Sequence, residues 1–420
     1  MRWNRWAAAA SVALAASLAP GAAATQTDGF VEPVEVLHTL SGSNPGAFYG
    51  WAVSELGDVD GDGKTDLVVG EPFTATGTTW VHSGRTGDLL YRLDGAPGDQ
   101  QGYAIADAGD TDGDGVPDIV SGAPGTGRGS AYLYSGATGR LLHRFSRGRD
   151  GDFFGAAVAG AGDVNRDGHA DVLVGAPLND GGGRDSGRAY VFSGRTYKLI
   201  RKLDAGDEGD LFGSATDWTP DLDDDGRPEL IVGAQDAGPT IGGKAYLFSG
   251  RNGRPLFTIT PPASAGEFGS FFVAGVGDVN GDGTGDVYAA DYADGSLGPG
   301  TGRAAVYSGA DGSELRSWTG SAAGEGLGPG REAGDVDGDG IVDLAIGSYT
   351  SSDGAPQAGK VEIFSGADGS LLRRITSTIA FENLGFDTVG VDDLNDDGVP
   401  DLLISAASGD RVYVVAGARE

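Results

Sequence analysis

A nine-residue acidic pattern occurs seven times in the chain, and this repetition constrains the fold more than any other feature. The copies, numbered here loop 1 to loop 7, begin at Asp58, Asp110, Asp163, Asp221, Asp278, Asp335 and Asp393. Successive copies are separated by 52 to 58 residues. Self-similarity at a fixed period is the signature of a repeat architecture. The repeats account for residues 34–420, so no second domain is expected there.

Each repeat contains four short segments with the composition of β-strands. A small-residue segment such as 156–160 precedes the acidic pattern, and a β-branched apolar segment such as 171–175 follows it. Two further segments come next, such as 131–136 and 141–145. Four short strands separated by turn residues are typical of one propeller blade. The sequence therefore predicts an all-β protein, a seven-bladed β-propeller of four-stranded antiparallel blades.

The two ends of the chain indicate how the ring closes. The seventh repeat stops after its third strand, at residues 412–417, and its fourth strand is missing. Residues 36–42 match the fourth-strand segment 89–95 of the first repeat. We expect this N-terminal strand to complete the last blade, because an open array would leave exposed strand edges.

The first residues have the character of a targeting segment. Arg2 and Arg5 precede an apolar stretch at 7–18, and three alanines at 22–24 offer a cleavage site. An apolar run this short indicates a secretory signal peptide rather than a membrane span. The expected organisation is a signal peptide at 1–24, a linker at 25–33 and the propeller at 34–420. It predicts a secreted protein, extracellular or periplasmic, with no membrane span in the mature chain.

The acidic loops have the ligand chemistry of a calcium site. Positions 1, 3, 5 and 9 carry oxygen-bearing side chains in all seven copies, and position 6 is always glycine. Ca²⁺ binds six to eight hard oxygen ligands, and a tight loop directs alternate residues to one point when a glycine takes positive φ. Position 7 is expected to add its backbone carbonyl. Up to seven structural Ca²⁺ ions are therefore predicted, since unneutralised carboxylates would repel one another.

The predicted ligands, loop by loop, are Asp58, Asp60, Asp62, Lys64 and Asp66; Asp110, Asp112, Asp114, Val116 and Asp118; Asp163, Asn165, Asp167, His169 and Asp171; Asp221, Asp223, Asp225, Arg227 and Glu229; Asp278, Asn280, Asp282, Thr284 and Asp286; Asp335, Asp337, Asp339, Ile341 and Asp343; and Asp393, Asn395, Asp397, Val399 and Asp401. Loop 4 has Glu229 at position 9 and Asp224 where most copies have glycine, and loop 3 has Arg166 beside its expected ion. The occupancy of these two loops is left open.

Composition narrows the range of partners. The formal net charge is −32, which makes nucleic acid an unsuitable partner because no positive field is present to displace phosphate counterions. The ligand positions of the seven loops hold 25 of the 61 acidic residues, so much of this charge has a structural explanation. The chain has no cysteine, which excludes disulfides, thiolate zinc sites and a cysteine nucleophile.

Two further elements link the repeats to a known family. Phe-Gly occurs at 154–155, 212–213 and 268–269, and Gly-Ala-Pro occurs at 122–124 and 175–177, with the acidic loop between the two elements. The chain thus resembles FG-GAP repeat proteins, whose repeats form the head propeller of integrin α subunits and occur in many bacterial secreted proteins. The resemblance implies a propeller with calcium on one face. Repeats 1, 2, 6 and 7 depart from the Phe-Gly element, with Tyr49, Gln101, Leu327 and Leu384 in place of Phe.

The sequence favours a binding function over catalysis. The four histidines stand outside any H-E-x-x-H motif, and the chain lacks G-x-S-x-G, so no enzyme is predicted. We expect a monomeric extracellular recognition or adhesion module that binds a glycan or protein through loops away from the metal. The least repeat-like stretches supply the candidate contacts Arg149, Asp150, Arg184, Asp185 and Tyr292. A polysaccharide lyase or hydrolase on a propeller scaffold, and a structural surface or matrix protein without a discrete ligand, remain as alternatives.

Overall fold

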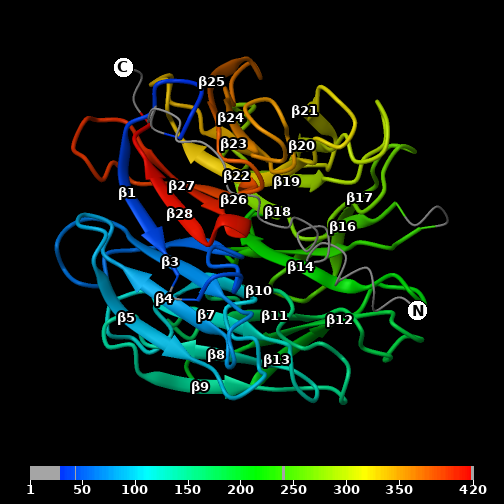
Figure 1. Ribbon diagram of the computed structural model, residues 1–420. Coiled ribbons are helices and arrows are strands. Elements are labelled where there is room, and N and C mark those ends of the chain that lie inside the picture. Colours follow the sequence, from blue (N-terminus) through cyan, green and yellow to red (C-terminus); the bar gives the residue numbers. More distant parts are fainter. Residues whose placement is uncertain (1–28, 43, 239–241, 418–420) are drawn as a thin grey trace.

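The computed structural model describes residues 29–42, 44–238 and 242–417, and these form seven four-stranded sheets arranged around one axis (Figure 1). Every strand pair within a sheet is antiparallel. The predicted class, an all-β seven-bladed propeller, is confirmed. The predicted signal peptide lies outside the described residues.

Blades 1 to 6 each contain four consecutive strands, numbered from the axis outward. Blade 1 has β2 (Val53–Leu56), β3 (Asp66–Glu71), β4 (Thr78–His82) and β5 (Leu89–Asp94); blade 2 has β6 (Ala104–Gly109), β7 (Asp118–Ala123), β8 (Ser130–Tyr134) and β9 (Leu141–Phe145); blade 3 has β10 (Val158–Gly160), β11 (Val172–Ala176), β12 (Arg188–Phe192) and β13 (Leu199–Leu203). Blade 4 has β14 (Phe212–Thr219), β15 (Glu229–Ala234), β16 (Lys244–Ser249) and β17 (Pro255–Ile259); blade 5 has β18 (Val273–Val276), β19 (Asp286–Asp291), β20 (Arg303–Tyr307) and β21 (Glu314–Thr319); blade 6 has β22 (Leu327–Gly334), β23 (Asp343–Ser348), β24 (Lys360–Phe364) and β25 (Leu371–Thr376).

Blade 7 joins the two ends of the chain. It contains β26 (Leu384–Val391), β27 (Asp401–Ala406), β28 (Arg411–Val415) and β1 (Val36–Ser41), with the short 3₁₀ helix η1 (Ala407–Gly409) before β28. Strand β1 pairs antiparallel with β28, with Leu40 opposite Val412. In Figure 1, the blue strand β1 lies beside the red strands of this blade. The predicted closure by the N-terminal strand is therefore confirmed.

The closure extends into the segment that the sequence assigns to a linker. Phe30 is buried, forms a β-bridge with Ser377 and meets the Tyr413 ring edge-on at 5.4 Å. Glu32 accepts hydrogen bonds from the backbone N–H and the hydroxyl of Thr376. Residues 29–33 thus connect blade 6 to blade 7 instead of merely leading into the first strand.

The hydrophobic core lies in the seams between blades. One cluster joins Leu173 of blade 3 to Phe212 and Leu230 of blade 4, and equivalent clusters fill the other seams. The second and third strands are buried along nearly their whole length because neighbouring blades cover both faces. This explains their continuous apolar sequences, which resemble those of strands in sheets covered on both sides.

Glycines of adjacent blades interlock. A Cβ on Gly175 of the Gly-Ala-Pro element would lie 2.1 Å from the carbonyl oxygen of Gly213 in the next Phe-Gly element. The same contact joins Gly122 to Gly155 at 2.1 Å. Real side chains never approach a backbone oxygen so closely, so both sequence elements mark direct backbone packing between successive blades.

The acidic loops and the blade entrances lie at opposite ends of the first strands. Each acidic loop follows the first strand of its blade. Residues before or within the first strands of all seven blades, together with Tyr292 and Tyr349 after two second strands, surround one recess on the axis. The ring therefore has an acidic-loop face and an opposite face. Among the described residues, no helix has both the length and the apolar character needed to span a membrane.

Candidate metal centres and ligand-binding recesses

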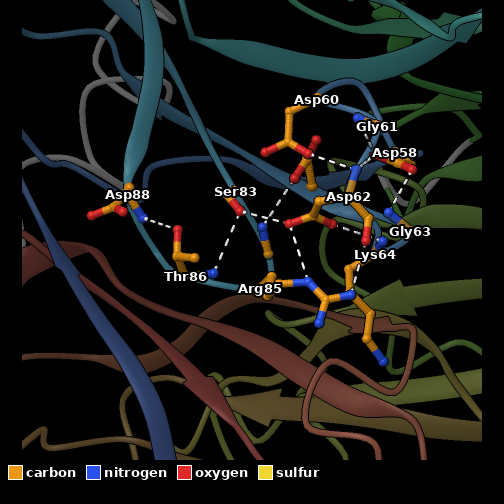
Figure 2. A network of polar contacts seen from close by, with 12 residues as sticks. Asp58, Asp60, Gly61, Asp62, Gly63, Lys64, Ser83, Arg85, Thr86 and Asp88 are labelled. Atoms are coloured by element: carbon orange, nitrogen blue, oxygen red, sulfur yellow. Dashed lines mark hydrogen bonds and ion pairs between the residues drawn. The ribbon is translucent and has the colours of Figure 1, made fainter.

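Carboxylate-to-backbone hydrogen bonds define the path of each acidic loop. In loop 1, Asp58 accepts hydrogen bonds from the N–H groups of Gly61 at 2.7 Å, Asp62 at 3.0 Å and Gly63 at 2.8 Å (Figure 2). Asp66 at position 9 accepts from Val59 at 2.9 Å and from Gly84 at 3.0 Å, so it ties the loop to the end of β4. The carboxylates at positions 1 and 9 thus stabilise the loop backbone through hydrogen bonds that do not depend on a cation.

Two backbone positions in each loop adopt the left-handed conformation. Position 6 is glycine, with φ between 80° and 90° in all seven loops. Position 4 is also left-handed, and there Arg166, Asp224 and Asp396 take φ values of 59°, 57° and 64°. Single polar residues tolerate this conformation at moderate cost. Loops 3, 4 and 7 therefore follow the same path as the four loops that have glycine at position 4.

Four loops bring at least three acidic groups together, with one ligand oxygen from each within 4.8 Å of the others. These clusters are Asp58, Asp60 and Asp62; Asp110, Asp112 and Asp118; Asp221, Asp223, Asp225 and Glu229; and Asp335, Asp337 and Asp339. Loop 4, whose occupancy the sequence left open, gathers all four of the acidic groups at its predicted side-chain ligand positions. Carboxylate clusters of this kind suit a hard divalent cation such as Ca²⁺.

Loop 4 has an additional sign that a cation fits. Glu229 Oε1 and Asp225 Oδ1 are buried and have no hydrogen-bond partner within the described part of the chain. Burial raises the pKa of Glu229 to about 8, and repulsion from Asp223, Asp221 and Asp225 adds to the shift. Unpartnered buried carboxylate oxygens are costly, and a bound cation would satisfy them.

The asparagine-containing loops differ in their charge balance. Among the described residues, loops 3, 5 and 7 form no cluster of three acidic groups. In loop 5, Asn280 donates from Nδ2 to Asp282 at 2.9 Å, and in loop 3 Asn165 donates to Asp171 at 3.0 Å. The asparagine amide replaces one negative charge and donates a hydrogen bond to a neighbouring carboxylate. Repulsion among the carboxylates is therefore weaker in these loops, and a cation stabilises them less.

The position-9 carboxylates share one electrostatic environment. Burial raises the pKa of Asp66, Asp118, Asp286, Asp343 and Asp401 to about 6. Backbone hydrogen bonds oppose the shift, and neighbouring loop carboxylates increase it. Without a cation, these carboxyl groups therefore take up protons near pH 6.

Side chains also connect successive acidic loops. Lys64 donates to the carbonyl of Asp393 in loop 7, Arg227 donates to the carbonyl of Val164 in loop 3, and His169 lies 3.0 Å from the carbonyl of Thr111 in loop 2. Arg166, expected beside the loop 3 ion, instead donates to the carbonyls of Asp225 at 2.8 Å and Gly226 at 3.2 Å in loop 4. These side chains thus link loop 7 to loop 1, loop 2 to loop 3, and loop 3 to loop 4.

An aromatic recess opens on the axis at the opposite face. It has a volume of about 160 Å³. Trp51 lies at the centre of its aromatic wall, with ring centroids 5.1 Å from Phe386 and 5.5 Å from Tyr103. The series continues from Phe386 to Tyr349 and then to Tyr292. The centroid of the Tyr349 ring lies 5.6 Å from that of Phe386 and 6.1 Å from that of Tyr292. Five of the seven blades contribute to this continuous wall.

Charged groups also line the axial recess. Arg331 donates to Asp387 at 2.7 Å, and Asp387 also accepts from the N–H of Val53 at 2.9 Å. Asp217, which lines the recess, has a pKa raised to about 6 by burial. Glu55 of β2 lies outside the lining, and its pKa is raised to about 7, mainly by desolvation and then by Glu332. The recess therefore combines an aromatic wall with the charged side chains of Asp217, Arg331 and Asp387.

The predicted ligand-contact residues divide between separate places. Tyr292 lines the axial recess and donates its hydroxyl to Glu267. Arg149 lines a second recess on blade 3. Asp150 lies 4.0 Å from Arg128, whereas Arg184 and Asp185 pair with each other at 3.4 Å. None of the last three lines either recess, so the five residues do not form a single site.

The aromatic wall is the feature that the sequence interpretation missed. A signal was present, because an aromatic residue follows the glycine of the Phe-Gly position at Trp51, Tyr103 and Phe386. Within one repeat, such a residue is indistinguishable from an ordinary core residue. Only the ring arrangement brings these positions from different blades to one point on the axis.

Comparisons with known proteins agree with this architecture. The FG-GAP repeat model matches residues 49–82, 154–192 and 332–364, and the FG-GAP-like repeat model matches residues 221–289. Integrin alpha-IIb of Homo sapiens is 33% identical over 236 residues, which are 47% of this chain and 21% of that protein. Integrin alpha-4 of Xenopus laevis is 32% identical over 164 residues, which are 34% of this chain and 16% of the relative.

The chain therefore spans about a fifth or less of the length of these relatives. A chain from the crystal structure of BBS1N in complex with ARL6DN, soaked with lead, superposes with a TM-score of 0.55 at 12% identity, covering 88% of this chain and 93% of that one. This likeness concerns the fold alone. From its matched repeats and its integrin relatives, the chain is an FG-GAP repeat protein, distantly related to integrin α subunits and folded as a seven-bladed β-propeller.

Proposed function

We propose that this protein is a secreted, calcium-stabilised recognition module that binds an extracellular glycan or protein on the face opposite its acidic loops. The observation that carries this proposal is the aromatic recess on the axis, with Trp51 and Phe386 in its wall and Asp387 also in its lining. Concave sites with an apolar wall and a few polar groups are characteristic of ligand binding. Repeat-family membership and the integrin relatives support an extracellular setting.

Calcium has a structural role in this proposal. The oxygen side chains at positions 1, 3, 5 and 9 would hold it, together with the backbone carbonyl at position 7. A bound cation neutralises carboxylates that otherwise repel one another. It would thereby stiffen the connection between the first and second strands of each blade and keep the opposite face in a fixed shape.

The environment of the histidines supports a binding role without catalysis. His82 lies 2.9 Å from the Tyr49 hydroxyl within the buried part of blade 1, and His143 stacks on Tyr197 at 4.6 Å. Burial lowers the pKa of both imidazoles. Both rings are engaged in packing between strands, away from either recess.

The test is a binding screen of residues 25–420 against arrays of glycans and of matrix or envelope proteins, with calcium and with chelator. We expect calcium-dependent binding to a defined ligand class, and at least a tenfold loss of affinity in Phe386→Ala. Phe381→Ala is the matched control, because Phe381 is 46% exposed and lies outside the recess wall. A folded, calcium-loaded protein that binds nothing would refute the proposal, as would equal losses in both variants.

A further inference from the structure

A second recess lies at the outer edge of blade 3, on the face opposite the acidic loops. It has a volume of about 340 Å³. The segment 147–149 between β9 and β10 and the segment 179–181 between β11 and β12 form two of its sides. Arg188 of β12 with Leu199 and Lys202 of β13 form the remainder. Its volume falls within the range of small-ligand sites.

The recess gathers positive charge in a strongly acidic protein. Arg147, Arg149 and Lys202 are exposed, and no carboxylate of the described residues lies within 4.0 Å of their charged groups. Arg188, the fourth cation, pairs with Asp204. Three cationic side chains without an acidic partner thus face one small volume.

Comparison with the other blades shows that this lack of pairing is local. Lys202 stands opposite Tyr190 in β12. The equivalent positions are held by Arg144 in blade 2, opposite Tyr132, and by Arg374 in blade 6, opposite Glu362. Arg144 pairs with Asp99 at 3.3 Å, and Arg374 pairs with Glu362 at 2.6 Å. Blade 3 keeps the cation at this position but has no acidic partner for it.

The carboxylates that border the recess are engaged elsewhere. Asp152 accepts from the Arg149 N–H at 2.8 Å and from Asn179 Nδ2. Asp180 accepts from the backbone N–H of Asp185 at 3.0 Å, and Asp204 is bound by Arg188. Their oxygens hold the surrounding loops in place, and the guanidinium groups of Arg147 and Arg149 remain available.

Local packing positions two of the cations. A Cβ on Gly181 would lie 2.3 Å from Nη2 of Arg188, so glycine lets this guanidinium lie directly against the loop backbone. The Arg147 guanidinium lies 5.9 Å from the centroid of the Phe192 ring, within cation–π distance. Leu199, which is only half-buried, supplies an apolar wall beside them.

We propose that this blade 3 recess binds an acidic sugar through its oxyanion, which is a uronate carboxylate or a sulfate ester. Planar guanidinium groups bind carboxylate and sulfate oxygens with paired hydrogen bonds, and Lys202 adds a point charge. The sugar ring then packs against Leu199. The inference deepens the proposed recognition role and rests on it only for the extracellular source of the sugar.

The test measures binding of residues 25–420, loaded with calcium, to three oligosaccharides by isothermal titration calorimetry. One contains glucuronate, one carries sulfate esters, and one is neutral. We expect one or both acidic probes to bind, the neutral probe to bind at least tenfold more weakly, and affinity to fall as salt screens the charges. Which acidic probe binds more tightly identifies the oxyanion.

Matched variants locate the site. We expect Arg147→Gln combined with Arg149→Gln, and separately Lys202→Gln, to lower affinity at least tenfold. Arg140→Gln is the control, because this exposed arginine lies in the β8–β9 turn on the acidic-loop face and changes the charge by the same amount as Lys202→Gln. Binding of neither acidic probe, equal binding of neutral and acidic probes, or equal losses in the control would overturn the proposal. Phe386→Ala should leave acidic-sugar binding intact, which separates failure here from failure of the axial site.

Discussion

At the scale of single residues, Glu229 shows how one side chain sets the demand for a cation. It is the only glutamate at position 9, and its longer side chain meets Asp221, Asp223 and Asp225 in one cluster. Its Oε1 is buried without a partner in the described structure. Loop 4 gathers more acidic groups than the other three clusters. Their mutual repulsion destabilises the folded state when no cation is bound.

Glu229→Gln should therefore have opposite effects with and without calcium. Without calcium, the variant loses carboxylate repulsion and should melt at a higher temperature than the parent. With calcium at about one hundred times Kd, the parent gains about 2.7 kcal/mol from one site, and the variant should lose much of that gain. Thermal melts with calcium and with chelator check this, with Glu208→Gln as an exposed control of equal charge change. A parent protein whose Tm does not respond to chelator would contradict both the prediction and the structural role of calcium.

A second residue-scale prediction concerns Glu55 of β2, the first strand of blade 1. Its pKa is raised to about 7 by desolvation first, and then by Glu332, Asp107 and Asp392. Since the folded pKa exceeds the unfolded value, the folded state binds the proton more tightly, and stability falls as pH rises from about 4.5 to 7. Glu55→Gln should remove this loss and raise Tm at pH 8, but leave Tm at pH 4.5 nearly unchanged. Thermal melts from pH 4.5 to 8 in saturating calcium, which keeps the acidic loops bound to the cation, measure this difference. If Tm depended on pH in the same way in the variant and the parent, Glu55 would not be the group responsible.

At the scale of strands, the repeat elements act through backbone contacts between blades. Gly175 in β11 faces the carbonyl oxygen of Gly213 in the next blade, and Phe212 fills the seam beside them. Gly175→Ala would force β11 away from β14, and we expect it to cost about 1–3 kcal/mol. The control is Gly295→Ala, because its added Cβ would meet nothing closer than 3.8 Å. Chemical unfolding followed by tryptophan fluorescence should show a clear loss for the first variant alone; equal stabilities would mean that the seam can relax.

The strands also show why sequence analysis succeeded where it did. The four segments of each repeat and the N-terminal strand of blade 7 were predictable, because each depends on local alternation and on a fixed period. The site was predictable in part: the loop carboxylates are close in sequence, and four of the clusters appear as expected. The aromatic wall could not be predicted, since Trp51, Tyr103 and Phe386 meet only after the ring has closed. The unpaired state of Lys202 likewise depends on which acids the fold places elsewhere.

At the scale of the whole molecule, closure brings the two ends of the chain into one sheet. Strand β1 covers the edge of β28, and Phe30 extends the contact to blade 6. Seven blades then surround one axis, and this arrangement forms the axial recess from residues of all seven blades. The stability of the ring and the shape of its candidate binding face therefore depend on the same N-terminal segment.

Removing residues 25–41 should open this ring. The truncated protein would expose the edge of β28 and the side chains that Leu40 and Phe30 cover, so we expect a lower Tm, faster proteolysis and self-association. A synthetic peptide of residues 29–42 should restore Tm in a concentration-dependent manner, because an added strand can pair with an open sheet edge. A scrambled peptide of the same composition serves as the control. If the truncated chain melts and resists protease like the full protein, then the seams between blades hold the ring without the N-terminal strand, and closure contributes nothing measurable.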